Sequence, residues 1–276
     1  MIEAVRERFE AAGARVETHH TTGPGHATEL GRDLEINEGD AMVAVGGDGT
    51  MHELVNGLMT RADGKKVPVG LIAGGTGNSL MRDLDCLDPV QAADRILSGT
   101  HQPLDIARVE AAGETIYSFN IVGWGLPAAI KQMSVKLAWL RGQQYNVATV
   151  IEVLKNVRRT AKLEIDGRTV DGEYEFILGC NTVHTGMGMK IAPGAKIGDG
   201  LIDLVIARDT GRLKMLSLFP KIFSGRHVDD PIVEVRQARS FAIEPGVEEP
   251  LNIDGELAGR TPVRVTVIPG AIDLLV

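Results

Sequence analysis

The stretch VAVGGDGTMHELVNG, residues 43–57, constrains the fold of this chain more than any other part of the sequence. Its apolar start is typical of a buried strand, its glycines of a tight turn and its end of a helix. The stretch VPVGLIAGGTGNSL, residues 67–80, has the same order of features. Strands separated by helices predict a parallel sheet covered on both faces. We therefore expect successive strands that each end in a glycine loop.

The pattern changes along the chain. The first hundred residues alternate between helix and strand signals, including a helix at the start and a strand over residues 14–21, ARVETHHT. Later stretches alternate with period two and predict strands, interrupted by helical stretches near 143–159 and 210–224. The sequence thus predicts an α/β domain over 1–102 and a mostly antiparallel β domain over 103–276. The last strand is a candidate to return to the first domain.

Composition restricts the class of protein. The chain has 276 residues, of which 43% are apolar, and a formal net charge of -8. An acidic chain does not suit binding to nucleic acid through neutralised phosphates. Its two cysteines, Cys86 and Cys180, form no metal-binding pattern, so we expect a reduced, cytoplasmic setting. No apolar run approaches the roughly 18 residues of a spanning helix.

The first glycine loop has a structural and a functional interpretation. Thr50 and Glu53 fit a capping box with Thr50 as the N-cap of the next helix. That box does not explain bare backbone around Asp48 at the carboxyl end of a parallel strand, where ligands bind in open α/β sheets. The glycines concerned are Gly46, Gly47 and Gly49.

The second glycine loop follows the same logic. Gly74, Gly75 and Gly77 flank Thr76, and successive backbone amides in such a turn can bind an anion. Neither loop completes a phosphate-loop or dinucleotide motif. Two loops at the ends of successive strands nevertheless indicate phosphate binding more strongly than either loop alone.

Taken in order, the motifs resemble one family. GGDGTMHELVNGL and GGTGNSL are followed by LDIARV at 104–109, IVGWG at 121–125, KIAPGAKIGDGLIDL at 190–204 and NIDGE at 252–256. This order resembles the diacylglycerol kinase catalytic domain family, which includes sphingosine, ceramide and bacterial lipid kinases. The resemblance implies an α/β domain of the NAD kinase and diacylglycerol kinase type and a C-terminal antiparallel β-sandwich. It also implies ATP-dependent phosphorylation of a lipid hydroxyl with Mg²⁺.

The resemblance implies roles for particular residues. Catalytic candidates are Asp48, Asp254 and Glu256. Nucleotide-binding candidates are Gly46, Gly47, Gly49, Thr50, Asn56, Gly75, Thr76, Gly77 and Asn78. The substrate candidates are Trp124 and Gly125, and the metal candidates are Asp105 and Asp199. The structural alternatives are a hairpin turn at NIDGE, a strand-edge acid at Asp105 and a metal-free glycine turn at Asp199.

Three departures from the family pattern bear on the function. Bacterial relatives carry an aspartate where this chain has Ser79, and sphingosine kinases carry one that recognises the lipid head group where this chain has Ala129. Relatives also begin with a strand and a glycine-serine turn that this sequence lacks. Such a strand would lie inside the sheet, so its neighbours would lose hydrogen-bond partners. A misplaced start, a fragment and a rearranged sheet are all open interpretations.

The sequence leaves open which partners the chain has besides ATP and a lipid. Residues 129–145 and 213–227 mix basic and apolar side chains, which is compatible with peripheral membrane contact and also with helices packed on the β domain. A homodimer is compatible with the sequence. The alternatives to a lipid kinase are a catalytically silent lipid- or nucleotide-binding module and, ranked lower, an NAD kinase.

Overall fold

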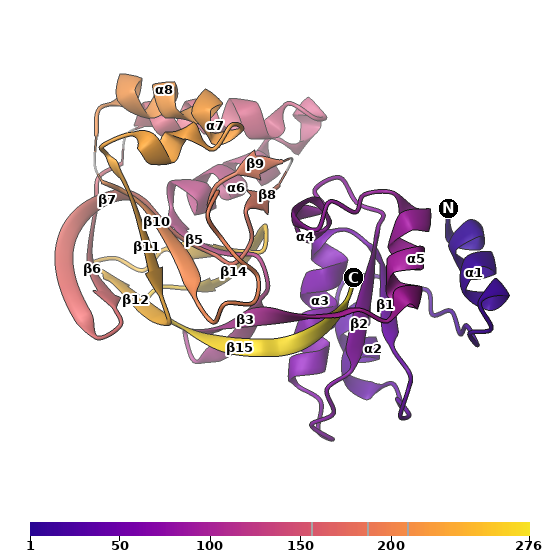
Figure 1. Cartoon of the computed structure of the whole chain (residues 1–276). Helices are drawn as coiled ribbons and strands as arrows, with labels where there is room; N and C mark the ends of the chain where they lie inside the picture. Colours follow the sequence, from indigo (N-terminus) through magenta and orange to yellow (C-terminus); the bar gives the residue numbers. More distant parts are fainter. Residues whose placement is uncertain (156, 187, 209) are drawn as a thin grey trace.

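The first domain is a short parallel sheet with helices on both sides (Figure 1). The computed structural model describes residues 1–155, 157–186, 188–208 and 210–276. The elements of this domain are α1 (Ile2–Ala11), α2 (His26–Asp33), β1 (Met42–Gly46), α3 (Asp48–Met59), β2 (Pro68–Ala73), α4 (Ser79–Asp83) and α5 (Pro89–Ser98). β1 and β2 pair in parallel from Met42–Val69 to Gly46–Ala73. Their carboxyl ends therefore lie side by side, as the sequence predicts.

The strand expected over residues 14–21 is absent. This segment has no strand assignment, and most of its side chains are exposed. In the described part of the chain, β1 pairs only with β2. A strand is stable only when a neighbour satisfies its backbone groups, and the segment has no such neighbour. The periodicity of the sequence was therefore not sufficient to make a strand here.

The second domain is built from antiparallel strands and carries a layer of helices. Its elements are β3 (His101–Ala111), β4 (Glu114–Ser118), β5 (Ile121–Gly125), α6 (Leu126–Lys136), η1 (Ala138–Leu140), α7 (Gln144–Lys155), β6 (Arg159–Ile165), β7 (Arg168–Cys180), β8 (His184–Thr185), β9 (Met189–Lys190), β10 (Ile202–Arg208), α8 (Arg212–Ile222), η2 (Arg226–Asp229), β11 (Val233–Ala238), β12 (Ser240–Pro245), β13 (Pro250–Ile253), β14 (Glu256–Arg260) and β15 (Val263–Leu275). The expected helical stretches are confirmed as α7 and α8, although residue 156 lies outside the described residues.

The strands β7 and β10 of the second domain bury side chains on both of their faces. On β7, Ile177 faces a core between the strands, whereas Phe176 and Leu178 belong to a second core under the helices. β10 does the same with Leu204 and Val205. Burial on both sides explains why β10 reads as a nearly continuous apolar run. The predicted combination of an α/β domain and an antiparallel β-sandwich is confirmed.

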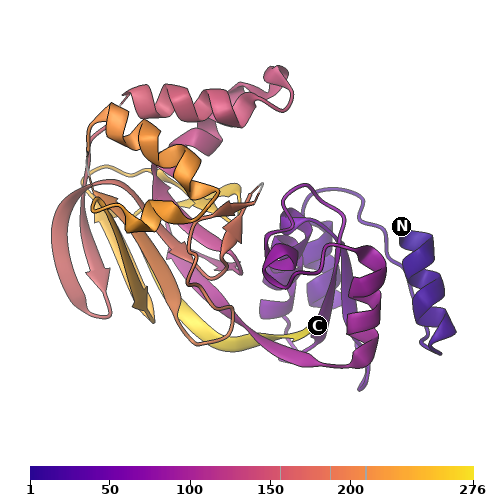
Figure 2. The ribbon, with the colours of Figure 1, turned by 45° about the horizontal axis from the view of Figure 1, so that its top comes forward.

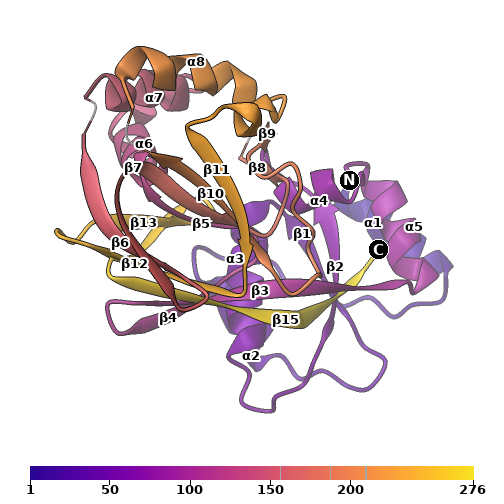
Figure 3. The ribbon, with the colours of Figure 1, turned by 60° about the vertical axis from the view of Figure 1, so that its left-hand side comes forward.

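The long strands β3 and β15 run through both domains (Figure 3). They pair antiparallel from Val263–Ala111 to Leu275–His101, with a register shift between Ile268 and Ile272. At its end, β15 also pairs in parallel with β2, from Asp273–Pro68 to Leu275–Gly70. The two domains therefore share a continuous, hydrogen-bonded ribbon and are not joined by a loose linker.

Trp124 and Gly125, the predicted substrate contacts, both have structural roles, and their contact with a substrate stays a prediction. The Trp124 side chain is 0% exposed and lies in the core between the strands. Gly125 has φ +85°, and a Cβ there would lie 2.5 Å from the Glu175 carbonyl oxygen. The glycine is thus required where β5 turns into α6. The family motif at this place is explained by packing.

The helices α6, α7 and α8 lie together on one side of the second domain, and α1 lies beside α5 at the outer side of the first (Figure 2). Within the described residues, no helix combines the length and the apolar character needed to cross a membrane.

The two tryptophans of the chain provide a test of this packing. Trp124→Ala removes a fully buried ring, and we expect it to lower the free energy of unfolding by about 3–5 kcal/mol. Trp139 is 73% exposed, so Trp139→Ala should change it by no more than about 0.5 kcal/mol. Urea unfolding of both variants measures the difference. Equal losses in the two variants would contradict the position of Trp124.

Candidate functional site

The two glycine loops lie against each other at the ends of β1 and β2. The Gly74 amide donates to the Gly46 carbonyl oxygen at 2.8 Å. A Cβ on Gly47 would lie 2.9 Å from the Gly75 Cα, and one on Gly75 would lie 2.5 Å from the Gly47 Cα. These glycines are therefore needed for contact between the loops. Gly49 is different, because a Cβ there would meet nothing within 4 Å, and its side of the loop is open.

The predicted capping box at Thr50 and Glu53 is wrong. The N-cap of α3 is Gly47, three residues earlier, and it makes no side-chain hydrogen bond to the first turn. The Glu53 carboxylate instead accepts hydrogen bonds from the amides of Gly25 at 2.9 Å and Ala27 at 3.1 Å. It thereby caps the neighbouring helix α2. The spacing fitted a local box, but the acceptor serves a helix that is distant in sequence.

Asp48 lies in the first turn of α3 and points at the second loop. Its Oδ1 accepts from the Ser79 amide at 2.7 Å and its Oδ2 from the Ser79 hydroxyl at 2.9 Å. Burial raises the pKa of Asp48, the Ser79 hydrogen bonds oppose the change, and the negative charge of Asp254 adds to it. A Cβ on Gly77 would lie 2.3 Å from Asp48 Oδ2, so this glycine makes room for the carboxylate.

The second loop is shaped by Asn78. Its side chain accepts from the Gly75 amide at 3.0 Å and donates to the Gly75 carbonyl at 2.8 Å. Asn78 itself has φ +52°, and it thus acts on the shape of the turn. The exposed part of the loop is formed by Gly74, Gly75 and Thr76. Arg82 donates from Nε to the Gly77 carbonyl at 2.8 Å.

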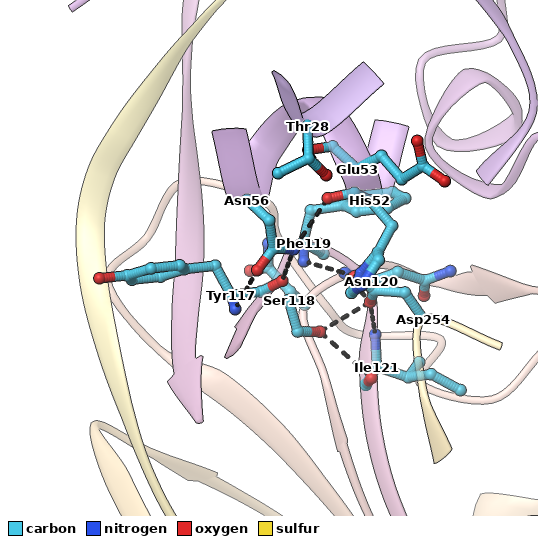
Figure 4. Close-up of polar contacts among 11 residues, drawn as sticks. Thr28, His52, Glu53, Asn56, Tyr117, Ser118, Phe119, Asn120, Ile121 and Asp254 are labelled. Atoms are coloured by element: carbon cyan, nitrogen blue, oxygen red, sulfur yellow. Dashed lines mark hydrogen bonds and ion pairs between the residues drawn. The ribbon is translucent and has the colours of Figure 1, made fainter. Parts of the chain in front are cut away.

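The Asp254 carboxylate is the most heavily hydrogen-bonded group of the site (Figure 4). Its side chain is 0% exposed. Its donors are the Ser118 hydroxyl at 2.7 Å, the amides of Phe119 at 3.2 Å, Asn120 at 2.9 Å and Ile121 at 3.0 Å, and His52 Nδ1 at 2.8 Å. With five donors on two oxygens, this carboxylate has little capacity left to accept a substrate proton.

His52 links the first domain to this carboxylate. It lies on α3 and was not selected from the sequence, although it precedes Asn56 by one helical turn. Burial lowers the pKa of His52, but the hydrogen bond and charge of Asp254, with smaller contributions from Glu256 and Glu53, outweigh burial and raise it. The His52–Asp254 pair therefore ties α3 to the turn between β13 and β14.

Asn56 of α3 makes a second link between the first domain and the second. Its Nδ2 donates to the carbonyl oxygens of Tyr117 and His52, each at 2.8 Å, and its Oδ1 accepts from the Tyr117 amide at 2.9 Å. Both amide hydrogens are used, and the side chain pairs with β4 much as a neighbouring strand would. The structure thus gives Asn56 a role in joining the domains, and its contact with a nucleotide stays a prediction.

Glu256 differs from the other two carboxylates because its side chain is 59% exposed. Its Oε2 lies 3.3 Å from Lys131 Nζ of α6. Burial, and after it the charge of Glu256, raises the pKa of Tyr145 at the start of α7. Glu256 thus lies among side chains from α3, α6 and α7, and it is available to solvent and to ligands.

Comparison with known proteins identifies the family. Residues 1–109 match the family model of the diacylglycerol kinase catalytic domain, and residues 120–276 match that of the YegS C-terminal NAD kinase beta sandwich-like domain. A diacylglycerol kinase of Bacillus subtilis is 31% identical over 262 residues, which cover 94% of this chain and 84% of that protein. The chain belongs to the diacylglycerol kinase catalytic domain family. These matches place it among the ATP-dependent lipid kinases.

Other members of the family carry a different name. Sphingosine kinase 1 of Arabidopsis thaliana is 27% identical over 315 residues, which cover 94% of this chain and 64% of the plant protein. This chain therefore spans a little less than two thirds of that relative.

Solved structures agree on the fold of this diacylglycerol kinase family member. The structure of a diacylglycerol kinase from Bacillus anthracis matches with a TM-score of 0.78 at 23% sequence identity. The match covers 99% of this chain and 90% of the Bacillus anthracis chain. The structure of an NAD kinase from Archaeoglobus fulgidus in complex with ATP matches with a TM-score of 0.54 at 12% sequence identity. This match covers 100% of this chain and 89% of the NAD kinase chain. The NAD kinase is a distant structural neighbour.

Asp105 connects two distant segments of this family member through hydrogen bonds. Its carboxylate accepts from the amides of Gly200 at 2.6 Å and Gly270 at 2.7 Å, and the residue is 1% exposed. It thus joins the loop before β10 to the register shift of β15. This geometry gives Asp105 a structural role, and its metal link to Asp48 stays a prediction.

Asp199 lies at a separate place. Its Oδ1 accepts from the Leu201 amide of its own turn at 3.1 Å. With Asp83 and Lys196 it lines a pocket of about 410 Å³ that contains no residue of the glycine loops. Within the described residues, no group of three or more histidine, cysteine or acidic side chains is arranged to hold a metal ion.

The His52–Asp254 pair predicts a pH-dependent contribution to stability. The folded pKa of His52 lies above its ordinary value of 6.5. The contribution is therefore complete below that value and is lost as the pH rises through the folded pKa. We expect the wild type to exceed His52→Gln in unfolding free energy by about 1–2 kcal/mol near pH 6, and by less near pH 9. Urea unfolding at both pH values measures the two differences, and a difference that does not change with pH would contradict this account.

Proposed function

We propose that this chain transfers the γ-phosphoryl group of ATP to a lipid hydroxyl where the first glycine loop and α3 meet the β13–β14 turn. The observation that carries the proposal is the set of three carboxylates, Asp48, Asp254 and Glu256, which come from both domains and act on one another. Asp254 is bonded to His52 of α3, and its charge raises the pKa of Asp48. The charge of Glu256 acts on His52.

The phosphates of ATP would bind at the exposed backbone of the two loops. The first turn of α3 has no side-chain cap, and helix N-termini of this kind attract phosphate. Gly49, Gly75 and Thr76 are exposed beside it. The contact between the loops would then fix the distance between the two sets of backbone groups.

Asp48 is the residue that would hold Mg²⁺ together with the phosphates. Each of its oxygens accepts one hydrogen bond from Ser79 and keeps a second lone pair for a hard cation. The open side of Gly49 leaves room next to it. A bound Mg²⁺ would neutralise charge on the phosphates.

Glu256 is the candidate proton acceptor. Asp254 is buried under five donors, whereas Glu256 is 59% exposed and has one ion-pair partner among the described residues. In the proposed step, a Glu256 oxygen takes the proton of the lipid hydroxyl, and the lipid oxygen forms a bond to the γ-phosphorus. The bond from that phosphorus to the bridging oxygen breaks, and ADP leaves with the electron pair. Asp254 would position the turn that carries Glu256.

Substitution of the carboxylates tests this assignment. We expect Glu256→Gln to lower kcat by about 10²–10⁴-fold, because it removes the proton acceptor, with little change in ATP affinity. Asp48→Asn should also remove most of the phosphoryl transfer, but with weaker binding of Mg²⁺-ATP. The matched control is Glu244→Gln, an exposed acid of β12, which should keep wild-type turnover.

The assay would use labelled ATP, Mg²⁺ and a panel of diacylglycerol, sphingosine, ceramide and NAD. Wild-type turnover in Glu256→Gln would contradict its role. Nucleotide binding without transfer to any acceptor in the wild type would favour a silent binding module. Transfer to NAD alone would favour an NAD kinase.

The outer face of α7 supports a peripheral membrane contact as part of the same proposal. Thr149 and Glu152 are buried, whereas Val147, Val150 and Leu154 are 36%, 47% and 48% exposed. The apolar stripe of this helix thus points away from the protein. Lys136, Arg141 and Lys155 are exposed close to it in the sequence, which matches a lipid surface with negative charges.

Trp139 offers a test of the membrane contact. It lies between α6 and α7 and is 73% exposed, so its ring could enter the interfacial region of a bilayer. We expect Trp139→Ala to lower binding to vesicles of mixed neutral and anionic phospholipid by about tenfold. Val247 is 75% exposed and lies outside this face, so Val247→Ala should bind as the wild type does. Vesicle co-sedimentation measures both, and equal binding by all three proteins would contradict the contact.

A further inference from the structure

The Lys131–Glu256 ion pair brings a cation to the place where the lipid hydroxyl would react. The two charged groups are 3.3 Å apart, and the Lys131 side chain is 19% exposed while that of Glu256 is 59% exposed. The stem of the lysine therefore lies against the protein, and its charged end reaches a largely open carboxylate. The Lys131 side chain therefore has less freedom to move than that of Lys136, which is exposed on the same helix.

The carboxylates at this place already have partners within the chain. Asp254 is paired with His52, and Glu256 with Lys131. Asp48 accepts both of its hydrogen bonds from Ser79. In the proposed function Asp48 holds Mg²⁺, so an incoming ammonium group beside Glu256 would meet a carboxylate that is already paired and would approach the charge of Lys131.

We propose that Lys131 sets the charge of the acceptor, so that this chain phosphorylates lipids with an uncharged head group and rejects long-chain amines. The inference rests on the proposed function, because it requires the acceptor hydroxyl to lie beside Glu256. Like charges held close together at a binding site act strongly against the wrong partner. An uncharged glycerol or amide head group leaves the Lys131–Glu256 pair intact and avoids this repulsion.

Residue 129 of the same helix offers no compensation. Ala129 lies two positions before Lys131 on α6 and contributes only a methyl group. The relatives of this chain include proteins named diacylglycerol kinase and proteins named sphingosine kinase. The charge at Lys131 favours the first kind of acceptor for this chain.

A pair of acceptors that differ in one charge tests the inference. Sphingosine and its N-acetyl derivative carry the same primary hydroxyl, but only sphingosine carries an ammonium group. We expect the wild type to have at least about tenfold higher kcat/KM for N-acetylsphingosine and for dioctanoylglycerol than for sphingosine. In Lys131→Gln the ratio should move towards sphingosine by about tenfold, whereas Lys131→Arg should keep it.

The controls separate the possible failures. Lys162→Gln removes an exposed cation of β6 that lies outside the proposed site and should leave the ratio unchanged, and thermal unfolding verifies that each variant is folded. Equal use of both acceptors by the wild type, or an unchanged ratio in a folded Lys131→Gln, would overturn the inference while the lipid kinase activity stands. If the wild type phosphorylates no lipid of the panel, the proposed function fails, and the inference fails with it.

Discussion

The buried Asp254 carboxylate is the interaction on which the rest of the site depends. A carboxylate without solvent contact is costly unless donors replace its hydration, and here five of them do. They come from the β4–β5 turn and from α3 of the first domain. The same group thus holds the two domains together at one point and fixes the turn in which Glu256 follows two residues later. In the proposed function, Asp254 therefore positions Glu256 and is not itself the proton acceptor.

The domains are connected on more than one side of this point. The shared strands β3 and β15 form one connection, and the Asn56 side chain pairs with β4 as another. A third is Asp83 of α4, which accepts from the His184 ring and from the amides of Val183 and His184. Because these contacts lie on separate elements, changes in the angle between the domains would disturb several hydrogen bonds at once. The geometry of the loops relative to the β13–β14 turn is therefore closely constrained.

Much of the fold could be predicted from the sequence because it depends on local pattern. Apolar runs that end in glycine loops specify parallel strands, and period-two alternation specifies the antiparallel ones. The partners of individual side chains could not be predicted in the same way. Glu53 fits a capping box, yet it caps α2. Trp124 belongs to a motif that resembles the family pattern, and its side chain fills a core. Residues 14–21 show the converse case, since a strand pattern without a neighbouring strand did not produce a strand.

The three carboxylates are equal candidates for catalysis in the sequence, but their hydrogen-bond partners and exposure differ in the structure. Asp254 is saturated with donors and buried, Asp48 is half satisfied by one serine, and Glu256 is open with a single cation beside it. A proton acceptor must be able to bind a proton, and a metal partner must have lone pairs that face the phosphates. The number of lone pairs left free within the chain therefore increases from Asp254 to Asp48 to Glu256. Ser79 determines the place of Asp48 in this order. Its hydroxyl donates a hydrogen bond to the Asp48 carboxylate, whereas an acid at position 79 would repel that carboxylate.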